Sequence, residues 1–240
     1  MDNSILSILK RNYHSIEELS PYERGTFQKI LACRTDPVPN MYLCCDHCKS
    51  SHPVLKSCKN RLCPICNGAA SLKWLAKREK EILPVKYFLA TFTIPKELRP
   101  VFLSNKKTCY NLLFKAVSKT LIECIKNNNR NFNGHAGFFT ILHTWDQRLN
   151  YHPHIHVVIP GGCLSQDKTS WNSSHHNFLL PVKKLSLVFR KKLLLFLRKE
   201  QKCSPLFLPK ERSTLSTLFN DLKHVPWVVN VQTPDKNRSE

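Results

Sequence analysis

Alternating apolar and polar residues predict a β-hairpin near the middle of the chain. In the run YHPHIHVVIP at 151–160, three β-branched residues fall on one face of a strand, whereas His154 and His156 fall on the other. The preceding run GFFTILHTW at 137–145 also has the composition of a strand. The polar segment between them is long enough to reverse the chain. We therefore expect these two strands to pair in antiparallel fashion.

Apolar residues at helical spacing, and short apolar runs bounded by proline, predict the other elements. Two helices are expected within 1–35, and the second has Ser20 as N-cap, Pro21 at its first position and Glu23 three residues after the cap. Further helices are expected at 69–83, 106–128, 182–200 and 214–223, strands at 85–94 and 227–231, and irregular segments at 37–68 and 161–180. The chain should be an α+β protein with an N-terminal module at 1–83 and a larger domain at 84–240.

The charge of the chain adds an expected class of partner to this picture. The 240 residues include 37 Lys and Arg but 17 Asp and Glu, which gives a formal net charge of +20. A polyanion would relieve the self-repulsion of such a chain, so nucleic acid is the first partner to expect. A merely basic soluble protein is the alternative. No apolar run approaches the ~20 residues that span a bilayer, and the N-terminus lacks the pattern of a signal peptide, so we expect a cytoplasmic protein without a membrane partner.

Six of the eleven cysteines fall within 23 positions, and they suggest a zinc site. The cytosol keeps thiols reduced, so disulfides are not expected. The runs CDHC and CPIC are two C-x-x-C pairs separated by fourteen residues, and two such turns can supply the four thiolates that Zn²⁺ prefers. The predicted ligands are Cys45, Cys48, Cys63 and Cys66. The alternatives are Cys44 in place of Cys45, or a ligand from Cys58, His47 or His52.

The remaining cysteines and the basic residues of this segment have other expected roles. A redox C-x-x-C is a weak alternative because neither pair has a βαβ context. The scattered cysteines are expected to be small core residues: Cys33, Cys109, Cys124, Cys163 and Cys203. The basic residues threaded through the zinc segment are candidate phosphate contacts, with a solvated face as the alternative: Lys49, Lys56, Lys59 and Arg61.

The histidines of the predicted hairpin suggest a second metal site. A turn centred near Arg148 and Leu149 would set His143 opposite His154 and His156, so that three imidazoles converge. His152 is the alternative third ligand. Any single one of these histidines is more simply explained as a sheet residue that hydrogen-bonds to the backbone or to water. For the group, we expect a divalent-metal site.

Ordered motifs along nearly the whole chain resemble the rolling-circle, HUH-type transposases of the bacterial insertion sequence 91 family. These motifs are ILACRT, SCKNRLCPIC, EILPVKYFLATFTIPKEL, YNLLFKAVSKTL, LHTWDQRLNYHPHIHVVIPGG, LPVKKLSLVFRKKLLLFL and WVV. The resemblance implies an N-terminal zinc-binding module followed by an HUH nuclease domain, an antiparallel sheet flanked by helices. It places the HUH motif on His154, Ile155 and His156, and the zinc pairs on the four cysteines of CDHC and CPIC. Single-stranded DNA and insertion-sequence ends are the implied partners.

The chain departs from the family pattern at three places. Leu62 stands where the family usually has His, and Asp146 replaces a usual Gly and adds a carboxylate close to the expected metal. The nucleophilic tyrosines of the family lie in a Y-x-x-x-Y helix beyond the WVV segment, which this sequence does not reach. We expect none of the six tyrosines present to be the nucleophile: Tyr13, Tyr22, Tyr42, Tyr87, Tyr110 and Tyr151.

Two functions follow as alternatives. The resemblance implies a transposase in which a divalent ion polarises a scissile phosphate of single-stranded DNA and a tyrosine attacks it, here as a truncated copy without the nucleophile. Imidazole suits Mn²⁺ better than Mg²⁺, unless Asp146 or Gln147 completes the site. The alternative is a non-catalytic, zinc-containing nucleic-acid-binding protein. The oligomeric state stays open.

Overall fold

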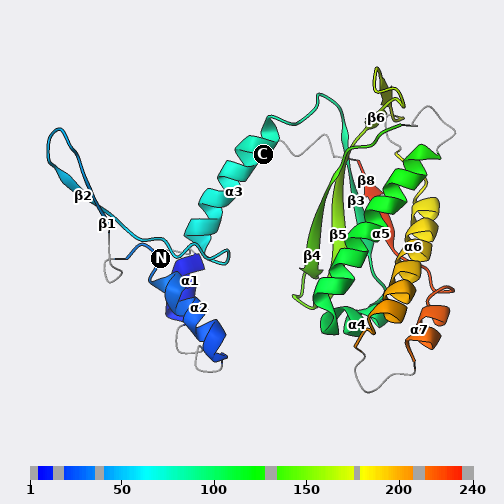
Figure 1. Cartoon of the computed structure of the whole chain (residues 1–240), viewed down its shortest axis with the longest axis horizontal. Coiled ribbons are helices and arrows are strands. Elements are labelled where there is room, and N and C mark those ends of the chain that lie inside the picture. The colour runs from blue at the N-terminus through cyan, green and yellow to red at the C-terminus, as the bar shows by residue number, and fades with distance from the viewer. Residues whose placement is uncertain are drawn as a thin grey trace. The chain divides into compact units, whose positions relative to one another are not determined.

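The computed structural model describes residues 5–12, 19–35, 41–127, 134–175, 179–207 and 214–233. The chain divides into two compact units, unit 1 at Met1–Ile82 and unit 2 at Leu83–Glu240. Helices and antiparallel strands make up both units, which confirms the α+β class (Figure 1). None of the described helices combines the length and the hydropathy needed to cross a bilayer.

Within its described residues, unit 1 contains three helices and one hairpin. The helices are α1 (Ile5–Arg11), α2 (Pro21–Leu31) and α3 (Pro64–Glu79), and the hairpin pairs β1 (Met41–Cys44) with β2 (Ser51–Val54). Helix α2 begins with the expected capping box, in which Ser20 and Glu23 exchange hydrogen bonds between side chain and backbone. The hairpin and the start of α3 at Pro64 lie within the segment expected to be irregular. They were missed because neither has an apolar period of its own.

A four-stranded antiparallel sheet is the frame of unit 2. Its order is β4 (Phe139–Trp145), β5 (Tyr151–Pro160), β3 (Tyr87–Thr93) and β8 (Val229–Gln232). β4 and β5 form the predicted hairpin, whose register sets His143 opposite His154. A second, smaller hairpin of β6 (Gly162–Leu164) and β7 (Trp171–Ser173) lies within the segment expected to be a loop.

Helices cover one face of this sheet. The helices of unit 2 are α4 (Arg99–Ser104), preceded by the 3₁₀ turn η2 (Lys96–Leu98), α5 (Lys106–Lys126), α6 (Val182–Cys203) and α7 (Leu215–Asp221). The long helices α5 and α6 run side by side over the sheet (Figure 1). Phe92 of β3 packs edge-on against Phe189 of α6, with ring centroids 5.2 Å apart.

The period of two along the strands separates a buried face from an open one. Ile155, Val157 and Ile159 of β5 are completely buried in the core beneath the helices. The alternate residues of the same strand, including His154 and His156, are half-buried on the opposite face. The sheet therefore presents the histidines on the face that the helices leave uncovered.

Candidate metal centres

Three histidines converge on the open face of the sheet. The possible ligand atoms of His143, His154 and His156 all lie within 4.8 Å of one another. Their ring centroids are 4.6 to 5.3 Å apart, and each pair of rings meets nearly edge to face. Such a spacing lets one nitrogen from each ring approach a single ion. The side chains are half-buried, so the group is held in place yet stays open to a ligand.

Hydrogen bonds at the Nδ1 atoms of His154 and His156 orient these two rings. The Nδ1 atom of His154 lies 2.7 Å from the carbonyl oxygen of His152, which can only accept a hydrogen bond. His154 must therefore carry its proton on Nδ1 and leave the lone pair of Nε2 free. The Nδ1 atom of His156 lies 3.1 Å from the hydroxyl of Thr91 on the adjacent strand. Such partners fix ring orientation in metal sites, so the geometry suits coordination through Nε2.

The surroundings also favour neutral imidazoles. Burial lowers the pKa of His143 below its ordinary value, and the neighbouring His154 lowers it further. Burial, then His143 and His154, lower the pKa of His156 in the same way. Because only the neutral ring can ligate, these rings are ready for a metal at neutral pH.

Two other candidate ligands around this site, His152 and Asp146, are engaged elsewhere. The Nδ1 atom of His152 accepts a close hydrogen bond from the Arg99 guanidinium, and His152 does not join the group of three. Asp146 does not join the group either. Its Oδ1 accepts hydrogen bonds from the backbone N–H groups of Arg148 and Asn150, both at 2.9 Å, so this carboxylate closes the hairpin turn. Gln147 lies in the same turn.

An exposed aromatic ring borders the three histidines. Trp145 is 53 % exposed, and its ring stacks parallel to that of His143 with centroids 5.8 Å apart and an interplanar angle of 4°. Phe139 and Ile141 precede Trp145 at alternate positions of the same strand and are also exposed. An open sheet face with a flat aromatic ring beside metal ligands can accept a stacked base.

The tyrosines of unit 2 have hydroxyls engaged away from the histidines. Tyr151 occupies the helix-covered face, where its hydroxyl lies 2.9 Å from that of Tyr110 on α5, and burial raises its pKa. Tyr87 is on the open face, but it lies four residues, or about 13 Å, along β3 from Thr91. Its hydroxyl accepts a hydrogen bond from the backbone N–H of Leu83. Tyr22 and Tyr42 belong to unit 1, and Tyr13 lies outside the described residues.

Four cysteines of unit 1 form a second group of potential ligands. The sulfur atoms of Cys33, Cys58, Cys63 and Cys66 lie within 4.8 Å of one another. The Sγ atom of Cys66 is 3.5 Å from that of Cys33 and 3.8 Å from that of Cys58. A zinc–sulfur bond of ~2.3 Å requires tetrahedral thiolates to be about 3.8 Å apart, so the four sulfurs fit one zinc ion.

Without a cation, burial disfavours the thiolate form of two of these cysteines. Burial raises the pKa of Cys58 to about 12, and it also raises that of Cys33. Burial acts on Cys66 in the same direction, but hydrogen bonds from Cys33 and from the backbone of Lys59 outweigh it and lower the pKa to about 7. A bound dication would hold all four as thiolates.

This group shares only Cys63 and Cys66 with the ligand set expected from the sequence. The structure brings these two together with Cys33 and Cys58, whereas Cys45 and Cys48 lie exposed in the turn of the β1–β2 hairpin. The hairpin base is fixed near Cys33 by a hydrogen bond from the Arg34 N–H to the Lys56 carbonyl. Several extended residues, at ~3.3 Å each, separate that base from the tip.

Cys33 is buried, as the sequence predicted for a small core residue, but its sulfur also belongs to the four-cysteine group. It follows the last turn of α2, and its sulfur accepts a hydrogen bond from the backbone N–H of Cys58 at 3.4 Å. The local sequence of Cys33 gives no metal signal, because its partners are 25 or more residues away. The motif ILACRT, which carries part of the family resemblance, was the available sign. The other scattered cysteines behave as expected except Cys203, which is exposed.

The basic candidates of unit 1 are all exposed. Lys59 and Arg61 line a shallow hollow with Arg34, next to Cys66. The polar side chains of Ser57, Asn60 and Asn67 complete this hollow. Lys49 lies at the hairpin tip and Lys56 at its base, outside the hollow. Three cations with polar neighbours form a candidate binding site for a phosphate group.

Two family models match the chain in succession. Residues 5–94 match a model described as a transposase zinc-binding domain, and residues 137–240 match one described as a putative transposase. The four-cysteine group lies within the first match and the three histidines within the second. The first match supports zinc as the metal of unit 1.

Curated relatives agree with both models. The chain is 36 % identical over 222 residues to "Putative transposase y4qJ" of Sinorhizobium fredii (strain NBRC 101917 / NGR234), an alignment that covers 90 % of this chain and 56 % of the relative. It is 30 % identical over 167 residues to "Transposase for insertion sequence element IS801" of Pseudomonas savastanoi pv. phaseolicola, covering 68 % of this chain and 40 % of the relative. The chain thus spans about half the length of the curated relatives it matches. Both models and both relatives agree with the motifs read from the sequence, and the chain belongs to the insertion sequence 91 family of transposases.

Proposed function

We propose that unit 2 binds single-stranded DNA at a divalent-metal site made by His143, His154 and His156, as part of rolling-circle transposition. The observation that carries this proposal is the convergence of three imidazoles on an uncovered sheet face, with the proton of His154 fixed on Nδ1. An ion held there would polarise a scissile phosphate. Imidazole ligands favour Mn²⁺ over Mg²⁺.

The residues around the histidines would position the strand. Trp145, exposed and parallel to His143, offers a face on which a base can stack. Thr91 holds the ring of His156 from behind, and Arg99 holds His152 beside it. In this arrangement the backbone phosphate would contact the ion, while the adjacent base would stack on the indole of Trp145.

We assign the zinc ion of unit 1 to Cys33, Cys58, Cys63 and Cys66. Their spacing fits tetrahedral zinc, and little else holds this unit together. The hollow of Arg34, Lys59 and Arg61 beside Cys66 would bind a DNA phosphate. Zinc thereby fixes the loop that carries these cations. Insertion-sequence ends are the DNA that a transposase of this family would bind.

Replacing Cys33 and Cys58 by serine should remove the zinc of this group and unfold unit 1. Buried hydroxyls cannot replace thiolates as soft ligands, and metal-binding free energy is folding free energy in such a module. Elemental analysis and limited proteolysis of the full chain measure the two effects. Cys203→Ser, an exposed cysteine of unit 2, is the matched control and should change neither. Full zinc content in the Cys33→Ser, Cys58→Ser variant would refute the ligand assignment.

Replacing His143 or His156 by alanine should weaken Mn²⁺ binding at least about tenfold, because each removes one of three ligands. Electron paramagnetic resonance of free Mn²⁺ gives the affinity. Since the pKa values of both rings are lowered, binding should hold as the pH falls to the ordinary histidine pKa and decline only below it.

His135→Ala is the control for this experiment, because that exposed imidazole of unit 2 bonds the carbonyl of Gln166 away from the group. Equal Mn²⁺ affinity in the His143→Ala, His156→Ala and control variants would exclude the histidine site. An affinity already falling above pH 7 would contradict the lowered pKa values.

Replacing Lys59 and Arg61 together by alanine should weaken single-stranded DNA binding and reduce its salt dependence. Each lost phosphate contact lowers the slope of log affinity against log salt by ~0.7, so the pair should remove about 1.4. Fluorescence anisotropy at several salt concentrations measures this slope. Lys10→Ala with Arg11→Ala removes the same charge from α1, outside the hollow, and should leave most of the slope. Equal losses in both double variants would mean that net charge alone binds the DNA.

The chain as given should form no covalent adduct with single-stranded oligonucleotides in Mn²⁺. Tyr87, Tyr110 and Tyr151 of unit 2 are engaged away from the histidines. A denaturing gel tests this expectation. A shifted band that a Tyr→Phe change abolishes would identify a nucleophile within this chain.

If the histidine variants also bound DNA and metal normally, the non-catalytic, zinc-containing binding protein would be the better description.

A further inference from the structure

The tip of the β1–β2 hairpin holds two cysteines that the four-cysteine group does not use. Cys45 and Cys48 are both exposed. The turn between the strands is closed by two backbone hydrogen bonds of 2.9 Å, from the Cys45 N–H to the Ser50 carbonyl and from the Lys49 N–H to the Cys45 carbonyl. The Sγ atom of Cys48 lies 2.9 Å from the hydroxyl of Ser50. The two cysteines are thus presented together on a closed turn.

The backbone after Cys48 matches that after two members of the four-cysteine group. Lys49 has a positive φ of 57°, while Arg34 after Cys33 has 59° and Lys59 after Cys58 has 50°. A left-handed conformation is uncommon for lysine and arginine, and it persists where surroundings impose it, as at ligand clamps. The residue after Cys48 therefore shares the left-handed backbone of the residues after Cys33 and Cys58.

Two thiolates leave a zinc site half complete. Zinc in structural sites takes four ligands in a tetrahedron. Within the described ranges, the groups of three or more potential ligands are the four cysteines and the three histidines, and neither includes Cys45 or Cys48. The neighbouring Cys44, His47 and His52 therefore do not complete the site. The two missing ligands must come from outside this hairpin.

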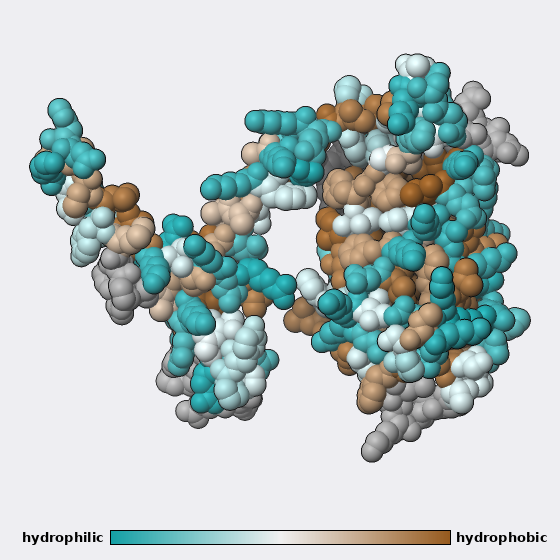
Figure 2. All heavy atoms as spheres, in the orientation of Figure 1, coloured by the Kyte–Doolittle hydropathy of each residue, from teal (hydrophilic) through white to brown (hydrophobic). Residues whose placement is uncertain are grey.

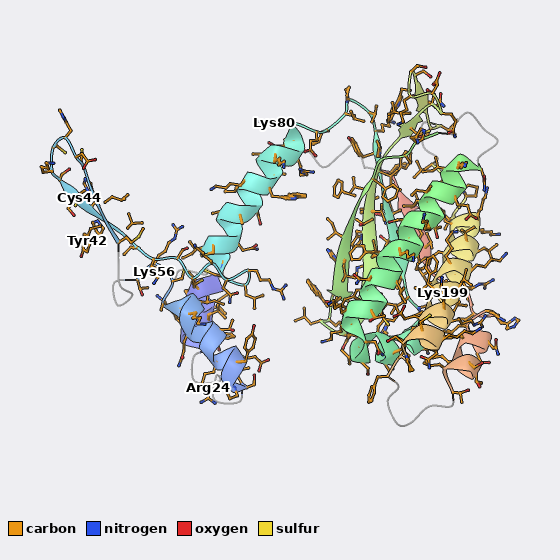
Figure 3. All side chains as sticks on the ribbon, in the orientation of Figure 1. Arg24, Tyr42, Cys44, Lys56, Lys80 and Lys199 are labelled. Atoms are coloured by element: carbon orange, nitrogen blue, oxygen red, sulfur yellow. The ribbon has the colours of Figure 1, made fainter. Side chains whose placement is uncertain are left out.

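The hairpin is also apolar and uncovered. All eight residues of β1 and β2 are exposed. Met41, Tyr42 and Leu43 are 68 %, 65 % and 61 % exposed, and Val54 of β2 lies opposite Met41. Figure 2 shows apolar residues along the hairpin, and Figure 3 shows Tyr42 and Cys44 on it. An isolated two-stranded hairpin is marginally stable, so such a surface calls for a covering partner.

We propose that two copies of the chain join through their β1–β2 hairpins and share one zinc ion, bound by Cys45 and Cys48 of each copy. A second copy is the occupant that supplies two further thiolates with the same turn geometry, in a two-fold arrangement where each residue meets its own counterpart. The apolar residues of one hairpin then cover those of the other. The four thiols release their protons to solvent as the ion binds.

Zinc content and molar mass of the full chain, measured together, test this inference. The purified protein should contain about one and a half zinc ions per chain, one in the four-cysteine group plus half of the shared ion. Light scattering should give the mass of two chains. Replacing Cys45 and Cys48 by serine should reduce the zinc to about one per chain and the mass to a single chain. Cys44→Ser, the adjacent strand residue, should change neither value.

A second variant tests the apolar contact between the hairpins without removing any cysteine. Leu43→Lys keeps every cysteine but places a charge in the apolar contact, so it should weaken dimerisation at least about tenfold. Far-ultraviolet circular dichroism should be the same in every variant if unit 1 stays folded. A monomer with two zinc ions per chain, a parent protein with one zinc per chain, or a Cys45→Ser, Cys48→Ser variant that stays dimeric would overturn the inference.

Discussion

The register of strand β5 is the constraint on which the rest of unit 2 depends. β5 pairs with β4 on one side and β3 on the other, and its side chains alternate between the helix-covered and the open faces. Completely buried Ile155, Val157 and Ile159 fix this alternation, because a slip of one residue would expose them and bury the histidines. Pairing with β4 then sets His143 opposite His154, and pairing with β3 sets Thr91 opposite His156. The convergence of the three histidines is thus a consequence of core packing on the reverse face.

The fold of unit 1 depends on its cysteine group rather than on a large apolar core. Among its described residues, those that are buried are Ile30, Cys33 and Cys63, and two of these three are cysteines of the metal group. Leu6, Leu9 and Ile65 add partial burial around them. So small an apolar cluster would not hold the helices and the hairpin base, and a metal supplies the missing free energy in modules of this size. The loop that carries Lys59 and Arg61 is positioned by the same cysteines, which would link the stability of the unit to the proposed contact with DNA.

Local patterns predicted much of the fold. The capping residues Ser20, Pro21 and Glu23 located α2, and the alternation around His154 and His156 located the β4–β5 hairpin with its facing histidine. The β1–β2 hairpin was not predicted, because all of its strand residues are exposed and no buried face imposes a period of two. β6 and β7 are three residues each, too short for a pattern.

The metal ligands show where sequence reasoning ends. Spacing alone pairs Cys45 and Cys48 with Cys63 and Cys66, since all four sit in C-x-x-C runs. The structure instead joins Cys63 and Cys66 to Cys33, at the end of α2, through contacts such as that between the Arg34 N–H and the Lys56 carbonyl. Those contacts are distant in sequence and invisible to spacing. Asp146 likewise looked available for a metal, but the tight turn that follows it uses its carboxylate.

In the proposed function, the histidines of the open face hold an ion that contacts a DNA phosphate directly. Electron–nuclear double resonance of Mn²⁺ bound to the full chain with a single-stranded oligonucleotide tests it most directly, because nuclear couplings report the atoms next to the ion. We predict nitrogen couplings from imidazoles that decrease in His156→Ala, together with a phosphorus coupling that appears when the oligonucleotide is added. Bound Mn²⁺ with no nitrogen coupling, or with no phosphorus coupling at saturating DNA, would contradict the account.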